Sequence, residues 1–262
     1  MSAVILTLGI VFTGTAYLRG RNRRPAIAVW RACSFFLGLI AVWIAVASPI
    51  ASLDRQMLTG HMIQHLLLMS IAPPLILMGE PLLALWPRRM SLVEKLARFL
   101  GHPGLCWFAS TLVLILWHVP SMFQLAMRSP TWHFIEHASF IATGLLFWWP
   151  VIEPWPAVAR WPRWSMLVYL FLATAPCDIL AGLLVFSDRV VYPMHHAMPG
   201  MGPQMGAFSP VEDQQFAAAL MWTCATVIYL VAGTIVSMEI LSPKLGRQYP
   251  LEPAELEEVV SI

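Results

Sequence analysis

The chain has 262 residues, of which 58% are hydrophobic and 11% are charged, and its mean hydropathy is +0.69. Soluble domains carry about 25% charged residues, so this composition excludes an ordinary soluble protein and indicates an integral membrane protein. The formal net charge of +2 says little about partners, and we expect no nucleic-acid partner.

Seven apolar runs can each form a membrane span, which takes roughly 20 mostly apolar residues. They lie at about 3–18, 26–47, 57–79, 103–119, 132–152, 164–186 and 214–238. The first run is short. We therefore predict an all-α fold, a polytopic bundle of seven transmembrane helices that forms a single integral membrane domain over residues 1–262.

Lys and Arg residues are distributed unequally between two sets of loops, with twelve in one set and three in the other. The first set is 19–25, 80–102, 153–163 and 239–262, and the second holds Arg55, Arg128 and Arg189. Because cytoplasmic loops carry the excess of positive residues, we predict the N-terminus outside and the C-terminus in the cytoplasm. Residues 187–213 are then an outer loop, and residues 243–262 are a cytoplasmic tail.

Prolines interrupt two of the runs. Ala72-Pro73-Pro74 falls inside the third run. Proline removes a backbone donor and crowds the preceding turn, so we expect this helix to kink or open there. Pro120 is expected to end the fourth run. The later segment 87–102 places basic and apolar residues at helical spacing, which predicts a helix on the cytoplasmic membrane surface.

Seven of the eight histidines fall on the predicted outer side, an asymmetry that helix formation does not require. His61 with His65, and His133 with His137, have the spacing that places two side chains on one helix face. His118 ends the fourth run. The pairs would also be explained by neutral imidazoles that only form hydrogen bonds between helices of the bundle. Ionisable groups inside a membrane are usually functional, so we predict a metal or haem site built from these five histidines.

Three further residues are candidates beside the histidines. Glu136 can orient an imidazole, bind metal or face water. Asp213 and Met221 share a face of the seventh run, and Asp213 is open to three interpretations: a ligand, an anchor for a histidine or a helix N-cap. Asp178, inside the sixth run, is expected to face the bundle interior or a water path.

The outer loop contains a segment rich in methionine and histidine. Its members are Met194, His195, His196, Met198, Met201 and Met205. Thioether ligands favour Cu(I), so the segment predicts capture of Cu(I), unless the loop folds back onto the membrane. The four cysteines have no CxxC spacing and lie in or beside apolar runs, which excludes a zinc finger or a disulfide frame.

These motifs resemble the CtaG family of seven-helix bacterial proteins required for assembly of caa-type cytochrome c oxidase. The matching phrases are His61-Met-Ile-Gln-His65, Ala72-Pro-Pro74, Trp117-His-Val-Pro120, His133-Phe-Ile-Glu-His137, Gly144-Leu-Leu-Phe-Trp-Trp-Pro150, and Asp213-Gln214 through Met221-Trp222. They occur in the family's order over roughly residues 55–240. The Met/His-rich segment is not carried over from the family.

The resemblance implies a multi-pass protein of the bacterial inner membrane that takes part in oxidase maturation. It implies copper as the metal, with the histidine motifs as the metal-binding positions. The expected partners are cytochrome c oxidase subunits, membrane lipid and other copper chaperones, and a homodimer stays open. We expect an assembly factor rather than an enzyme.

Two alternatives use the same histidines. His133-x-x-Glu136-His137 has the order of an intramembrane zinc metalloprotease motif, with Glu136 as the base, and it would need a third ligand from another helix. Haem handling or electron transfer would use facing histidines as axial ligands, with Arg55 or Arg128 near the propionates.

Overall fold

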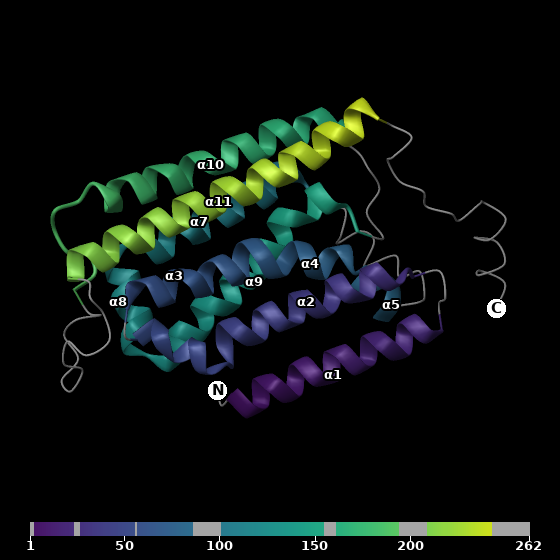
Figure 1. The fold of residues 1–262 in the computed structure, drawn as a ribbon, viewed down its shortest axis with the longest axis horizontal. Coiled ribbons are helices and arrows are strands. Elements are labelled where there is room, and N and C mark those ends of the chain that lie inside the picture. The colour runs from purple at the N-terminus through teal and green to yellow at the C-terminus, as the bar shows by residue number, and fades with distance from the viewer. Residues whose placement is uncertain are drawn as a thin grey trace.

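The computed structural model describes residues 3–23, 27–55, 57–85, 101–154, 161–193 and 209–242, and all regular structure in these ranges is helical. The elements are α1 (Ala3–Asn22), α2 (Val29–Val46), η1 (Pro49–Arg55), α3 (Leu58–Leu66), η2 (Leu67–Ile71), α4 (Ala72–Met78), α5 (Pro81–Leu85), α7 (Pro103–His118), α8 (Pro120–Arg128), α9 (Pro130–Ile152), α10 (Arg163–Val185) and α11 (Pro210–Leu241). Figure 1 shows them as an elongated bundle. The all-α prediction is confirmed.

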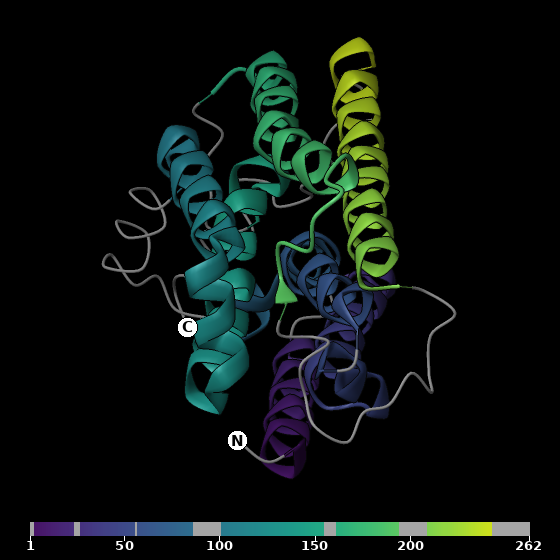
Figure 2. The same ribbon diagram turned by 90° about the vertical axis from the view of Figure 1, so that its left-hand side faces the viewer.

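Six described helices are long and apolar enough to cross a membrane, and the bent pair α7–α8 raises the number to seven. Successive spans alternate in direction, so α1 begins and α11 ends toward opposite ends of the bundle (Figures 1 and 2). Arg31, Arg163 and the carboxylates they bind, Glu80 and Glu239, lie at the end where α11 finishes. Which end faces the cytoplasm stays a prediction from the loop charges.

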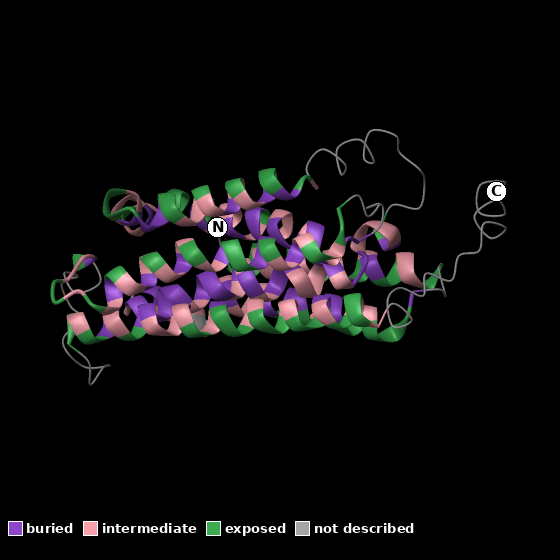
Figure 3. Cartoon of the chain, turned by 90° about the horizontal axis from the view of Figure 1, so that it is seen from above, coloured by how far each residue is buried: buried purple, intermediate pink, exposed green. Residues whose placement is uncertain are grey.

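The outward faces of the helices are apolar as well as the inward faces. Large side chains such as Phe12 on α1, Phe171 on α10 and Leu230 on α11 are mostly exposed. Figure 3 shows exposed positions along the outside of the bundle and buried positions between the helices. Helices that are hydrophobic all round are stable where lipid replaces water, so this surface is that of a membrane protein.

The third span is one continuous helix made of α3, a π-helical turn (η2) and α4, and the prolines explain the π-helical turn. Pro73 and Pro74 have no N–H, so the carbonyls four residues earlier lose their usual helical donors. The chain widens to the π-helical turn just before the prolines, and the Trp148 indole donates to the Met69 carbonyl at 3.3 Å. The predicted opening at Ala72-Pro73-Pro74 is confirmed, and it begins directly after the turn that carries His65.

Two glycines let neighbouring helices approach this span. A Cβ on Gly144 of α9 would lie 2.7 Å from Pro73 Cγ and 2.8 Å from the Met69 carbonyl oxygen. A Cβ on Gly38 of α2 would lie 2.7 Å from Ile76 Cγ1. Only glycine fits at such distances. The absence of a side chain at these two positions therefore allows α9 and α2 to pack closely against the third span, which places α9 next to α3.

The fourth span ends at Pro120 as predicted, but the chain continues as a helix. The axis of α8 turns by 75° from that of α7. Phe123 and Ala126 on α8 are buried, so the amphipathic segment caps this end of the bundle. The helix was not predicted because it is short and mixes polar with apolar residues. α11 is also longer than its predicted run. Residues 86–100 and 243–262, where a surface helix and a tail were predicted, lie outside the described residues.

We expect Gly144→Ala to lower the free energy of unfolding in detergent by about 1–3 kcal/mol, because overpacking a close helix contact displaces its neighbours. Gly182→Ala on α10 is the matched control, since a Cβ there meets nothing within 4 Å and alanine favours a helix. Circular dichroism during chemical unfolding measures both variants. Equal stability of the two would contradict the close packing of α9 on the third span.

Candidate metal centre

Three helices bring five imidazoles together at one end of the bundle. His61 and His65 stand one turn apart on α3, His133 and His137 stand one turn apart on α9, and His118 is the last residue of α7. Ring centroids are 4.2 Å apart within each pair. Across the helices, they are 5.8 Å apart for His61 and His133 and 6.2 Å for His65 with His137 or His118. The structure therefore places all five predicted ligands in one cluster.

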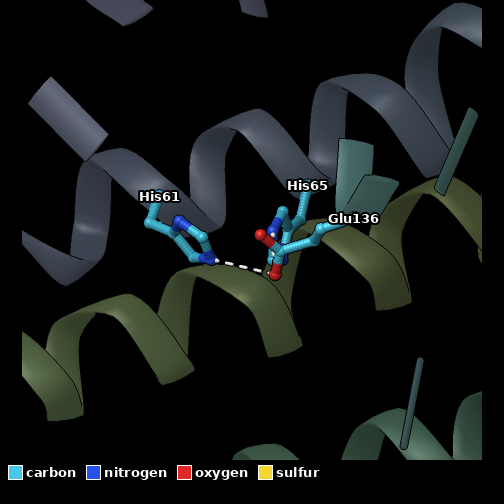
Figure 4. A group of neighbouring side chains, drawn as sticks. All are labelled: His61, His65 and Glu136. Atoms are coloured by element: carbon cyan, nitrogen blue, oxygen red, sulfur yellow. Dashed lines mark ion pairs between the residues drawn. The ribbon is translucent and has the colours of Figure 1, made fainter. Parts of the chain in front are cut away.

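The Glu136 carboxylate lies in the middle of this cluster and is fully buried. Its Oε1 is 3.5 Å from His61 Nε2 and 3.4 Å from His65 Nε2, while Oε2 is 3.9 Å from His133 Nε2. Figure 4 shows His61 and His65 extending from one face of α3 toward this carboxylate. Of the interpretations open from the sequence, contact with imidazoles is the one that the geometry supports, rather than a carboxylate facing water.

Asp54 is a further carboxylate at the cluster that sequence reasoning missed. It is buried on the short helix η1, and its Oδ2 lies 3.3 Å from His133 Nε2. The available signal was an acidic residue in the short loop directly before the His61 helix. That signal is weak, because a loop carboxylate ordinarily faces water.

The surroundings of the imidazoles are apolar on several sides. His65 packs against Phe140 with ring centroids 4.2 Å apart, and His61 packs against Phe123 at 5.2 Å. His118 donates through Nδ1 to the Leu114 carbonyl at 2.7 Å, which fixes its Nε2 as the nitrogen with the lone pair.

Several ring nitrogens in the cluster are poised to coordinate a metal. Nε2 of His118, Nε2 of His137 and Nδ1 of His65 are buried with no hydrogen-bond partner among the described residues. Leaving such an atom unsatisfied costs about 1–3 kcal/mol. Imidazole nitrogens with carboxylate oxygens suit copper, zinc or iron, so the residues present fit a bound metal ion.

Asp213 does not lie against the imidazoles but holds the start of α3. Its carboxylate accepts from the backbone N–H groups of Leu58 at 2.7 Å and Thr59 at 3.2 Å, and from the Thr59 hydroxyl at 2.6 Å. The first N–H groups of a helix need such acceptors. Asp213 thus satisfies the first N–H groups of α3 from a distant part of the chain, whereas the N-cap residue of α3 is Met57. The N-cap of α11 is Ser209, which forms a capping box with Glu212.

The segment before the Met/His-rich sequence is also fixed at the cluster. Gln214 accepts from Val191 N–H at 2.7 Å and donates to the Arg189 carbonyl at 3.1 Å. The Tyr192 hydroxyl donates to the His118 carbonyl at 2.8 Å. Burial raises the pKa of the Tyr192 phenol, which keeps it a donor.

The remaining candidates are placed as follows. Met221 is buried in an apolar cluster with Leu58, Met62 and Phe123, directly beside the imidazole region. Asp178 is half-buried on α10. The Met/His-rich segment lies outside the described residues, and its members are Met194, His195, His196, Met198, Met201 and Met205.

Comparison with known families identifies the chain's relatives. The model of the cytochrome c oxidase caa3 assembly factor family (Caa3_CtaG) matches residues 12–242. The chain belongs to this family. The match confirms the resemblance seen in the histidine and proline motifs and extends it to α2 and to the part of α1 from residue 12 onward. No curated protein and no solved structure matches the chain.

The geometry gives physical roles to several of the phrases that carry the family resemblance. The two histidine pairs and His118 converge, the prolines open the span after His65, and Gly144 admits α9 to that opening. Asp213 is part of the same arrangement because it holds the helix that carries His61 and His65.

We expect Asp213→Ala to lower the free energy of unfolding by about 1–2 kcal/mol, the usual loss when a helix cap is removed. Asp188→Ala, on the exposed part of the preceding segment, is the control and is expected to change stability little. Thermal unfolding followed by circular dichroism in detergent measures both. If the two variants melt alike, Asp213 does not hold α3.

Proposed function

We propose that this member of the assembly factor family binds copper at the histidine cluster and supplies it to cytochrome c oxidase during assembly. The observation that carries the proposal is the convergence of five imidazoles on the buried Glu136 carboxylate. The family is known by its role in oxidase assembly, and the association with oxidase components follows from that role.

The donor chemistry supports copper. Imidazole binds copper well, and copper lies at the top of the affinity order for divalent ions. An assembly factor for a copper-containing oxidase has use for a copper site, whereas zinc or iron would need a separate explanation. The proposed partners are oxidase subunits and other copper chaperones, in the bacterial inner membrane.

The position of the cluster favours transfer. His61 and His133 are each in the first turn of their helices, and His118 is the last residue of α7. A metal held there is close to the end of the bundle, so a partner can approach it without crossing the apolar interior. The loop charges predict that this end is the outer one.

The Met/His-rich sequence follows a segment that reaches the cluster. Tyr192 bonds to the carbonyl of His118, and on the far side of the sequence Asp213 bonds to the start of the His61 helix. The described residues on the two sides of this sequence are thus bonded to α7 and α3, the helices that carry His118, His61 and His65. Soft thioether donors in the intervening sequence would suit a step in which Cu(I) is collected and then passed to the imidazoles.

The protease interpretation is less well supported by the same contacts. A general base of that class acts on water beside an open metal position. Glu136 is fully buried and lies within 4 Å of three imidazoles, which suits a ligand better than a base. Among the residues that the structure describes, no contact favours the haem interpretation over copper.

The direct test is the copper content of the full-length protein, purified in detergent from copper-supplemented cells and measured by mass spectrometry. We expect His65→Ala and His137→Ala each to lower the content. The double variant should bind copper at least about tenfold more weakly, since even outer-sphere changes weaken metal sites by about 10–100-fold. Assembly of active oxidase in cells should fall in parallel.

His102→Ala is the matched control, because His102 precedes α7 at the other end of the bundle and contacts Trp161. It should leave the copper content unchanged. Wild-type copper content in both cluster variants would refute the site.

A further inference from the structure

We infer that the cluster holds two metal ions rather than one, with the Glu136 carboxylate as the bridge between them. The inference rests on the proposed function, because it concerns the same cluster. One ion would be held by His61, His65 and Glu136, and the other by His133, His137 and Glu136.

The first argument is that the potential ligands fall into two groups of three. In each group the ligand atoms lie within 4.8 Å of one another, and Glu136 belongs to both groups. Metal–nitrogen bonds of about 2.0–2.1 Å limit two donors of one ion to about 4 Å apart. Small side-chain movements satisfy that limit within each group.

The second argument is the way the carboxylate is shared. Oε1 approaches the two imidazoles of α3, and Oε2 approaches His133 of α9. Each oxygen of an ionised carboxylate has its own lone pairs, so each can bind one ion. Metal ions bridged in two-metal sites lie roughly 3.5–4 Å apart, a spacing that one carboxylate spans.

The third argument is the spacing of the rings. Rings of the same helix are 4.2 Å apart, while facing rings of different helices are 5.8 and 6.2 Å apart. Histidines four residues apart on one helix bind a common ion in known metal motifs. The closer spacing within each helix assigns one ion to α3 and one to α9.

The fourth argument is charge. Buried net charge is costly. The single negative charge of Glu136 offsets at most half of the charge of two Cu(I) ions, so further acidic or neutral donors are needed. Asp54 adds a second carboxylate at His133, and His118 adds an imidazole near His65. Each proposed ion therefore has a fourth potential donor, a neutral one on the α3 side and an acidic one on the α9 side.

The test is a titration of detergent-purified, metal-free protein with Cu(II), followed by mass spectrometry and electron paramagnetic resonance. Wild-type protein should retain two copper ions per chain. Its resonance signal should account for clearly less than two uncoupled spins, since a carboxylate bridge couples them. Glu136→Gln should either lose one ion or restore the full uncoupled signal.

Variants of the ligands should remove the two proposed ions one at a time. His65→Ala and His137→Ala should each retain one ion with an uncoupled signal, and His102→Ala should retain two coupled ions. If an alanine variant fails to fold, the conservative variants His65→Gln and His137→Gln serve the same test. The number of copper ions and the resonance signal of the wild-type protein are measured without any variant.

Three outcomes overturn the inference in distinguishable ways. If the wild-type chain retains one copper ion, and either alanine variant loses it, the cluster is a single mononuclear centre. That result leaves the proposed copper function intact. Two ions with two full uncoupled spins in wild-type protein exclude the bridge. No copper in wild-type protein overturns the proposed function together with the two-ion inference.

Discussion

A buried carboxylate among imidazoles is the interaction on which the rest of this structure depends. Glu136 has no exposed surface, and a buried carboxylate is costly unless its charge is compensated. The imidazole nitrogens 3.4–3.9 Å from it come from a different helix as well as its own, so α3 and α9 must stay side by side at a fixed register. Loss of that register would leave the Glu136 carboxylate uncompensated in an apolar bundle. The packing of the helices and the geometry of the site therefore depend on each other.

A second contact, at the prolines of the third span, fixes the same register away from the site. Pro73 opens the third span, Trp148 bonds to the carbonyl that the proline leaves free, and Gly144 allows α9 to close on the opening. A π-helical turn is a frequent feature beside functional sites because it shifts the face that a helix presents. Here it follows the turn that carries His65, so residues before and after the π-helical turn can face different neighbours. The histidines face α9 and α7, while α4 packs on both α2 and α9.

Features that depend on local sequence were predictable, and features that depend on distant contacts were not. The spans, the opening at the prolines and the candidate ligands on α3 and α9 follow from hydropathy, proline chemistry and the four-residue spacing. Asp54 was missed because its burial results from the packing of η1 against α3 and His133. The interpretation of Asp213 as the N-cap of its own helix was wrong, because Ser209 takes that position. The helix whose N–H groups Asp213 binds lies 155 residues earlier in the chain, which no local pattern shows.

The helix ends that carry the site are held by hydrogen bonds from other elements. Asp213, Gln214 and Tyr192 tie α11 and the preceding segment to α3 and to the end of α7. His65 and His137 lie one turn deeper than His61 and His133, a difference of about 6 Å at 1.5 Å per residue. Burial does not follow this depth on α3, since His61 is fully buried and His65 is 7% exposed. The ligands near the helix ends are therefore covered by neighbouring elements, and Phe123 of α8 packs directly against His61.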